Sequence, residues 1–242
     1  MYSSKKLYFL QSEGHKDKKL EGDGKYPLST RLAVETIGTY LLASTVALSS
    51  LSGNLGPLAI GFILSISIFA FGHISGGHFN PAVTLAVWAR GKVGKKDAAL
   101  YILVQLLGAL IGAIQQSFVL DDLDLSIAYP ARQAGWISAI VTEITFTFAL
   151  ATVVLNVATT KAQENNDYFG LAIGLTVAAA AAVGGPVSGG AFNPAIGVVL
   201  PIVSGNPEGI WVYMIGPFLG ALLAAGFFRL TAAPEEFESS EE

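Results

Sequence analysis

The chain has 242 residues, of which 52% are hydrophobic and only 13% are charged. A soluble domain carries about 25% charged residues, so this composition excludes an ordinary soluble globular protein and a disordered one. Cysteine is absent, which excludes disulfides and thiolate metal sites, and three histidines are too few for a multi-histidine metal cage. No basic stretch suggests a nucleic-acid partner. Together with a mean hydropathy of +0.56, these features indicate a protein that resides in a lipid bilayer.

Six apolar stretches are long enough to cross a bilayer as helices, which takes about 20 residues each. Two further apolar stretches follow an Asn-Pro-Ala tripeptide and are too short to span. The sequence therefore predicts an all-α membrane protein with six transmembrane helices plus two re-entrant half-helices. The six stretches are roughly 31–51, 56–75, 98–120, 135–157, 167–187 and 209–230, and the short ones are 81–90 and 194–204.

Basic residues are sorted to one side of this arrangement. With six spans, 13 of the 14 Lys and Arg residues fall on the same face of the membrane, and only Arg132 falls on the other. Cytoplasmic segments carry the excess of basic residues, so both termini are expected to be cytoplasmic. Residues 1–30 are predicted to form a polar cytoplasmic tail without a cleavable signal peptide, and residues 231–242 a disordered acidic cytoplasmic tail.

The chain contains an internal repeat at a spacing of about 113 residues. Leu58–Gly61 recurs as Leu171–Gly174, and Ser75–Ala82 recurs as Ser188–Ala195 with a single internal change, His78 to Ala191. Repeat one covers about 31–120 and repeat two about 135–230. Each repeat has three spans and one half-span, so the second repeat enters the membrane from the opposite side. The two repeats are therefore inverted, and their half-helices are expected to meet near the midplane.

The Asn-Pro-Ala tripeptides are expected to begin these half-helices. Asn is a preferred N-cap and Pro is favoured at the first helical position. Non-helical backbone at membrane depth is tolerated where it lines a water-filled cavity, so two such segments predict a polar path. Asn80 and Asn193 would then cap two facing helix N-termini, with their side-chain NH2 groups free to donate into the lumen. Backbone carbonyls leading to each Asn would form a ladder of acceptors, from Gly76, Gly77, His78, Gly189, Gly190 and Ala191.

Such a centre would pass a neutral hydrogen-bonding solute and oppose cations. Each helix N-terminus carries about half a positive charge, and a water molecule between two Asn donors could not relay a proton. One Asn-Pro-Ala alone has no diagnostic value, because a short tripeptide commonly caps a surface helix. The informative observation is two copies inside an inverted repeat, at Asn80-Pro81-Ala82 and Asn193-Pro194-Ala195.

Taken together, the paired motifs resemble the aquaporin, or major intrinsic protein, family over residues 31–230. The resemblance implies a homotetramer with one pore in each subunit. It also implies that Glu35 and Glu143 are buried acceptors that brace the re-entrant loops, for which a proton-relay role is the alternative. For His73 and His78, packing or lining of the pore is expected rather than a pH sensor or metal pair. No cofactor and no metal is expected.

The resemblance breaks down at the family's selectivity constriction. Its four positions fall on Ile60, Ala181, Gly190 and Ile196, whereas family water and glycerol channels have Arg at the last of these. Gly197 likewise replaces the Asp of glycerol channels. Two aliphatic and two minimal residues predict a wide, apolar constriction that passes water and small neutral solutes such as glycerol, urea or ammonia.

Besides a channel, one other class of function remains open at this point. An apolar constriction that dewets would give a poorly conducting or gated protein with a mainly structural membrane role. An intramembrane enzyme is not expected, because the spans offer no paired Asp and the chain has no Gly-x-Ser-x-Gly motif. The expected location is the plasma membrane or an internal, vacuolar-type membrane, with water, small neutral solutes and the lipid bilayer as partners.

Overall fold

The computed structural model describes residues 25–119 and 135–237, and within these ranges the regular structure is helical. Arg132 and the neighbouring acidic residues therefore lie outside the described part. The helices are α1 (Leu28–Leu48), η1 (Ser49–Leu55), α2 (Gly56–Ser75), α3 (Pro81–Ala89), α4 (Lys95–Val119), α5 (Gly135–Thr159), η2 (Lys161–Gln163), α6 (Phe169–Ser188), α7 (Pro194–Val203), α8 (Ile210–Thr231) and η3 (Pro234–Glu236).

The described residues hold five apolar helical stretches long enough to cross a membrane, and the first is twice the usual length. This 48-residue stretch, Leu28–Ser75, contains α1 and α2 joined through η1. Gly53 breaks it, because its φ of 53° and ψ of −129° are not helical and lie where glycine is favoured. The stretch therefore supplies two spans, so the predicted six spans and two half-helices are all present and the fold class is confirmed.

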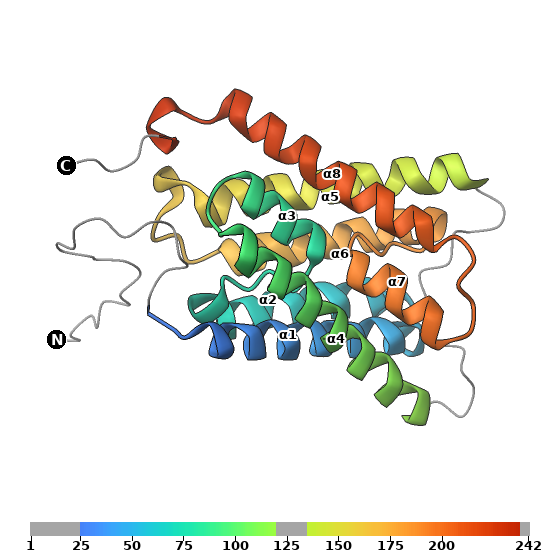
Figure 1. The fold of residues 1–242 in the computed structure, drawn as a ribbon. Coiled ribbons are helices and arrows are strands. Elements are labelled where there is room, and N and C mark those ends of the chain that lie inside the picture. The colour runs from blue at the N-terminus through green and yellow to red at the C-terminus, as the bar shows by residue number, and fades with distance from the viewer. Residues whose placement is uncertain (1–24, 120–134, 238–242) are drawn as a thin grey trace, which may run out of the picture.

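Packing follows the repeat. The most extensive contacts join α1 to α4 and α5 to α8, which are the same pair in the two repeats, and α2 to α6 across the repeats. Each half-helix also packs on a span of the other repeat: α3 packs on α8, and α7 packs on α4. In Figure 1, α3 occupies the end of the bundle where α1 begins and α8 ends, whereas α7 occupies the opposite end. This is the arrangement expected of inverted repeats.

The α2–α6 crossing is held close by the glycines that end the repeated Leu-Ala-Ile-Gly segments. A Cβ atom on Gly61 would lie 2.5 Å from the carbonyl oxygen of Gly174 and 2.6 Å from the Cβ of Ala178. A Cβ atom on Gly174 would lie 2.0 Å from Ser65 Oγ and 2.3 Å from the carbonyl oxygen of Gly61. Small residues allow such close helix contact in membranes. The repeated motif thus marks the contact between the two repeats.

Gly174→Ala is expected to lower the thermal stability of the purified protein, because the added methyl group would overlap backbone atoms of α2. Overpacking of this kind costs about 1–3 kcal/mol. Gly226→Ala in α8 is the matched control, since no atom lies within 4 Å of the position of its new Cβ. Thermal unfolding in detergent would compare the two variants. Equal melting temperatures would contradict the close crossing.

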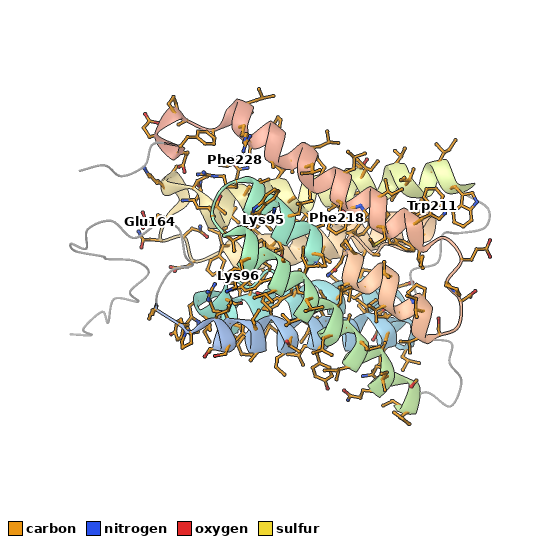
Figure 2. All side chains as sticks on the ribbon, viewed as in Figure 1. Lys95, Lys96, Glu164, Trp211, Phe218 and Phe228 are labelled. Atoms are coloured by element: carbon orange, nitrogen blue, oxygen red, sulfur yellow. The ribbon has the colours of Figure 1, made fainter. Side chains whose placement is uncertain are left out.

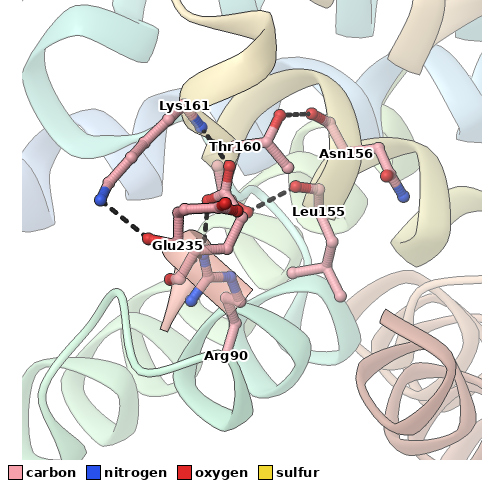
Figure 3. Close-up of polar contacts among 8 residues, drawn as sticks. Arg90, Leu155, Asn156, Thr160, Lys161 and Glu235 are labelled. Carbon is pink, nitrogen blue, oxygen red and sulfur yellow. Dashed lines mark hydrogen bonds and ion pairs between the residues drawn. The ribbon is translucent and has the colours of Figure 1, made fainter. Parts of the chain in front are cut away.

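The described residues after α8 pack against the bundle, so the expectation of a disordered tail is wrong for Pro234–Phe237. We call Ala233–Phe237 the C-terminal strap. The Glu236 carboxylate forms an ion pair with Arg90 at 3.0 Å and accepts the backbone N–H of Lys161 at 2.7 Å. Figure 3 shows Arg90 and Lys161 reaching the strap from opposite sides. Runs of acidic residues are usually solvated, but here a buried cation needs a partner.

The two ends of the bundle differ in their side chains. Lys95, Lys96 and Glu164 lie at the end that carries the strap, and Trp211 lies at the other end (Figure 2). There Trp211 packs on Trp136, with 5.7 Å between the ring centroids. Tryptophan is enriched where a membrane meets water, so this pair fits the rim of a transmembrane bundle.

Candidate functional site

The two re-entrant loops have nearly identical backbone conformations. Gly76 and Gly77 have φ angles of 93° and 64°, and Gly189 and Gly190 have φ angles of 89° and 68°. These left-handed values favour glycine and explain why both repeats keep the Gly-Gly pair. The phenylalanine before each Asn, at 79 and 192, is also left-handed, with φ of 49° and 48°. Such strain in a bulky residue persists only where the surroundings enforce it.

The asparagines cap the half-helices as their sequence pattern predicts. Asn80 Oδ1 accepts the N–H of Ala82 at 2.8 Å, and Asn193 Oδ1 accepts the N–H of Ala195 at 3.0 Å. Both asparagines have extended backbone conformations, as N-caps usually do. Pro81 and Pro194 then occupy the first helical positions, where their missing N–H groups cost nothing.

The side-chain amides link the two repeats. Asn80 Nδ2 donates to the carbonyl oxygen of Phe192 at 2.8 Å, and Asn193 Nδ2 donates to the carbonyl oxygen of Phe79 at 2.9 Å. The expectation that these NH2 groups stay free is therefore wrong for one hydrogen of each. Among the described residues each Nδ2 has one acceptor, which leaves its second hydrogen for a molecule at the centre. The reciprocal bonds fix the separation of the two half-helix N-termini.

Two buried carboxylates hold the loops that precede the asparagines. Glu35 is fully buried and accepts the backbone N–H groups of His78 and Phe79 at 3.0 and 2.8 Å. Glu143, also fully buried, accepts those of Ala191 and Phe192 at 3.0 and 2.7 Å. Each carboxylate also accepts a hydrogen bond from a serine hydroxyl, Glu35 from Ser75 at 2.6 Å and Glu143 from Ser188 at 2.7 Å. These bonds satisfy backbone donors that the irregular loops would otherwise leave unpaired.

The carboxylate of the first repeat has an additional partner that the sequence analysis missed. Gln105 Nε2 donates to Glu35 Oε2 at 2.8 Å and to Thr84 Oγ1 at 2.9 Å. Their counterparts in the second repeat, by the 112- and 113-residue offsets, are Pro217 and Gly197, which offer no such donor. The sequence does hold a signal for this role. Gln105 is a polar amide within an apolar span, and polar groups inside a membrane need partners.

The candidate carbonyl ladder lies between a tyrosine and an asparagine in each repeat. The hydroxyl of Tyr101 donates to the carbonyl oxygen of Ser75 at 2.8 Å, and that of Tyr213 donates to the carbonyl oxygen of Ser188. Within the described ranges, no protein donor binds the carbonyl oxygens that follow. Those acceptors are therefore free for water or solute, and they belong to Gly76, Gly77, His78, Gly189, Gly190 and Ala191.

The four predicted constriction residues differ in exposure. Ile60, Ala181 and Gly190 are partly exposed, whereas Ile196 is only 1% exposed and lies in the main hydrophobic core. In this conformation Ile196 offers almost no surface to a water-sized molecule. Position 197 has no room for an acidic side chain in this structure. A Cβ atom on Gly197 would lie 2.4 Å from the Cβ of Tyr213, so the space is already filled.

His73 and His78 lie in different surroundings, and among the described residues no group of three or more His, Asp or Glu side chains is placed to hold a metal ion. His78 is buried, with Nδ1 3.1 Å from Thr84 Oγ1 and its ring 5.3 Å from that of Tyr101. His73 is exposed at the end of α2, where its ring packs edge-on against Tyr26. Of the two, only His78 belongs to the polar cluster around the first re-entrant loop.

Comparison with known proteins agrees with this geometry. The model of the family "Major intrinsic protein" matches residues 28–228. The chain is 32% identical to nodulin-26 of Glycine max over 215 residues, which is 84% of this chain and 78% of that protein. It is 34% identical to glycerol uptake facilitator protein-like 6 of Lactiplantibacillus plantarum over 213 residues, which is 83% of this chain and 97% of that protein.

A solved structure supports the fold independently of sequence. The X-ray structure of the aquaglyceroporin from Plasmodium falciparum superposes with a TM-score of 0.77 at 19% sequence identity. The superposition covers 87% of this chain and 99% of that one. At 19% sequence identity, this match shows the fold alone.

Proposed function

Because the chain belongs to the major intrinsic protein family, we propose that it is a passive channel for water and small neutral solutes. The observation that carries the proposal is the reciprocal bonding of Asn80 and Asn193 across the two repeats. It holds two positive helix ends together at the centre of a path lined by free carbonyl oxygens. A neutral solute exchanges its hydrogen bonds with water for bonds to these groups, whereas a cation meets the two helix dipoles.

The proposed solute range includes glycerol, urea or ammonia besides water. It rests on the constriction residues Ile60, Ala181, Gly190 and Ile196, none of which carries a charge or a side-chain donor. Glu35 and Glu143 are proposed to brace the two loops rather than to relay protons, because each carboxylate binds backbone N–H groups of its own loop. The protein is proposed to have no enzymatic activity.

Proteoliposome swelling in stopped flow tests the channel. Vesicles that contain the protein are expected to respond to water, glycerol and urea gradients faster than empty vesicles. No increase for any solute would favour the second candidate, a closed or structural member of the family. The burial of Ile196 is the observation that supports this second candidate.

Ile196→Arg is expected to narrow the solute range toward water. A guanidinium group would restore the donor and the positive charge that family channels place at this position. The measurement is the ratio of glycerol to water permeability in the same vesicles, and Ile202→Arg, at an exposed position of α7, is the control. An unchanged ratio would mean that Ile196 is not part of the constriction.

The remaining features of the assembly are also proposals. Both termini are assigned to the cytoplasm from the distribution of basic residues, and the channel domain is assigned to residues 31–230. A homotetramer with one pore in each subunit is proposed from family membership. The plasma membrane or a vacuolar-type membrane is the proposed location.

A further inference from the structure

Arg90, the C-cap of half-helix α3, lies between two aromatic rings and the C-terminal strap. Its guanidinium carbon is 4.8 Å from the ring centroid of Phe228 and 5.0 Å from that of Phe237. Its Nη2 donates to Glu236, both to the backbone oxygen at 2.9 Å and to the carboxylate at 3.0 Å. The side chains of Arg90 and Glu236 are only 4% and 7% exposed. The strap therefore places a buried carboxylate against a buried cation.

The half-helix fold does not itself require this cation. At the 113-residue offset of the repeat, the counterpart of Arg90 is Val203, the last residue of α7. Helix α7 has the same Asn cap and Pro start as α3, and Val203 packs against the main hydrophobic core. A buried charge without a partner is costly, and the partner of Arg90 comes from the strap. The charge at position 90 is therefore explained by the strap and not by the half-helix.

The strap also binds the α5–α6 connection, residues 160–168. Glu236 Oε1 accepts the backbone N–H of Lys161 at 2.7 Å, and Lys161 Nζ donates to the backbone oxygen of Glu235 at 2.8 Å. Figure 3 shows the strap between Lys161 and Arg90. One carboxylate thus joins the half-helix of the first repeat to a connection within the second repeat.

Most of the strap is otherwise exposed. Ala233, Pro234 and Glu235 are exposed, and the Phe237 ring is 46% exposed. The strap's own backbone bonds stay within its single turn, from Glu236 N–H to the Ala233 oxygen and from Phe237 N–H to the Pro234 oxygen, both at 3.0 Å. Segments with few buried apolar contacts open locally at a lower free energy than the whole fold. The strap can therefore leave its site while the bundle stays folded.

The connection that the strap holds leads to the first re-entrant loop. Phe169, the first residue of α6, packs on Phe69 of α2 with 5.6 Å between the ring centroids. A Cβ atom on Gly72 would lie 3.7 Å from the Phe169 ring, and one on Gly77 would lie 3.3 Å from the Cα of Gly72. Gly77 belongs to the candidate carbonyl ladder. A movement of the connection would therefore reach the ladder through two packed contacts.

We propose that the C-terminal strap is a detachable internal ligand that latches the α5–α6 connection to half-helix α3. Its acceptor site consists of the Arg90 guanidinium, the Phe228 ring and the Lys161 backbone N–H. This site binds a carboxylate followed by an aromatic residue, through charge-assisted hydrogen bonds and cation–π contact. Release of Glu236 opens the site and frees the connection. The inference goes beyond the proposed channel function and does not depend on it.

Hydrogen–deuterium exchange of the purified full chain in detergent tests the latch. Glu236→Gln keeps an acceptor but offers no charge to Arg90. It is expected to speed exchange at Lys161 about tenfold, the shift in opening that follows from losing one charge-assisted hydrogen bond. Glu235→Gln is the matched control, because it removes the same charge from an exposed neighbour and keeps the backbone oxygen that Lys161 binds. It is expected to leave exchange at Lys161 unchanged, and exchange in α4 is expected to be equal in all three proteins.

A peptide added in trans tests the acceptor site directly. The amidated peptide Ala-Pro-Glu-Glu-Phe has the sequence of the strap. It is expected to slow exchange at Lys161 in the full-length Glu236→Gln variant, because the weakened strap leaves the site open for part of the time. The same peptide with Gln in place of its second Glu is expected to have no effect.

Four outcomes would overturn the proposal. Unchanged exchange in Glu236→Gln would mean that this carboxylate does not hold the connection, and an equal rise in Glu235→Gln would indicate a general effect of charge. An equal rise in α4 would make the strap part of the cooperative fold and not a detachable segment. Equal effects of the two peptides would exclude the acceptor site. No permeability is measured, so failure of the latch is distinguishable from failure of the channel assay.

Discussion

Glu35→Gln is expected to unfold at a lower temperature than Glu143→Gln, although the two carboxylates occupy equivalent places in the repeats. Each oxygen of Glu35 accepts two hydrogen bonds, so an amide NH2 in either place would face two donors. Among the described residues, Glu143 Oε2 accepts a single hydrogen bond, from the N–H of Phe192, so an NH2 in its place faces one donor. Leaving a buried donor unsatisfied costs about 1–3 kcal/mol.

The measurement is thermal unfolding of both purified variants in the same detergent. Gln105→Leu combined with Glu35→Gln is the informative control, because it removes one of the donors that the new amide would face. This pair of changes is expected to cost less than the sum of the two single changes. A larger loss in Glu143→Gln than in Glu35→Gln would contradict the hydrogen-bond arrangement described for the two loops.

Asn80→Asp is expected to admit monovalent cations while half-helix α3 stays capped. One carboxylate oxygen can accept the N–H of Ala82 as the amide oxygen does, and the other would lie about where Nδ2 lies now. Two facing helix ends contribute roughly one positive charge at the centre, and a carboxylate offsets it. A tenfold rise in cation flux corresponds to a barrier lowered by about 1.4 kcal/mol.

Potassium flux from loaded vesicles is the measurement, with water permeability as the measure of correctly folded protein. Asn54→Asp is the matched control, because it adds the same charge at an exposed position in η1, between α1 and α2. If Asn80→Asp passed water but no more potassium than Asn54→Asp, the centre of the pore would not be the cation barrier.

The fold was predictable because its signals are local and occur twice. Each span is recognisable as a stretch of about 20 apolar residues, and each half-helix begins with an Asn cap followed by Pro. The left-handed glycines at 76 and 189 appear in the same registers of both repeats. The inverted arrangement then follows from counting three spans per repeat. None of these steps needs a contact between residues distant in the chain.

What could not be predicted depends on such distant contacts. The bond from Asn80 to Phe192 joins residues 112 positions apart, and no local pattern specifies it. Gln105 lies outside the repeated motif, so the comparison of the two repeats gave it no role. The acidic composition of the strap is typical of solvated tails, whereas its position is set by the buried cation Arg90, which lies far from it in the sequence.

The reciprocal asparagine bonds also bear on how the protein is made. The ribosome adds roughly 5–20 residues per second, so about 6–22 s separate the synthesis of Asn80 from that of Phe192. During this interval the first re-entrant loop has its own carboxylate but lacks the carbonyl oxygen that its asparagine binds. The first repeat therefore enters the membrane as an incomplete structure, and the later arrival of the second repeat completes both loops at once. A ribosome that stalls between the repeats would leave in the membrane a half-protein in which the side-chain amide of Asn80 lacks the carbonyl oxygen that it binds in the full chain.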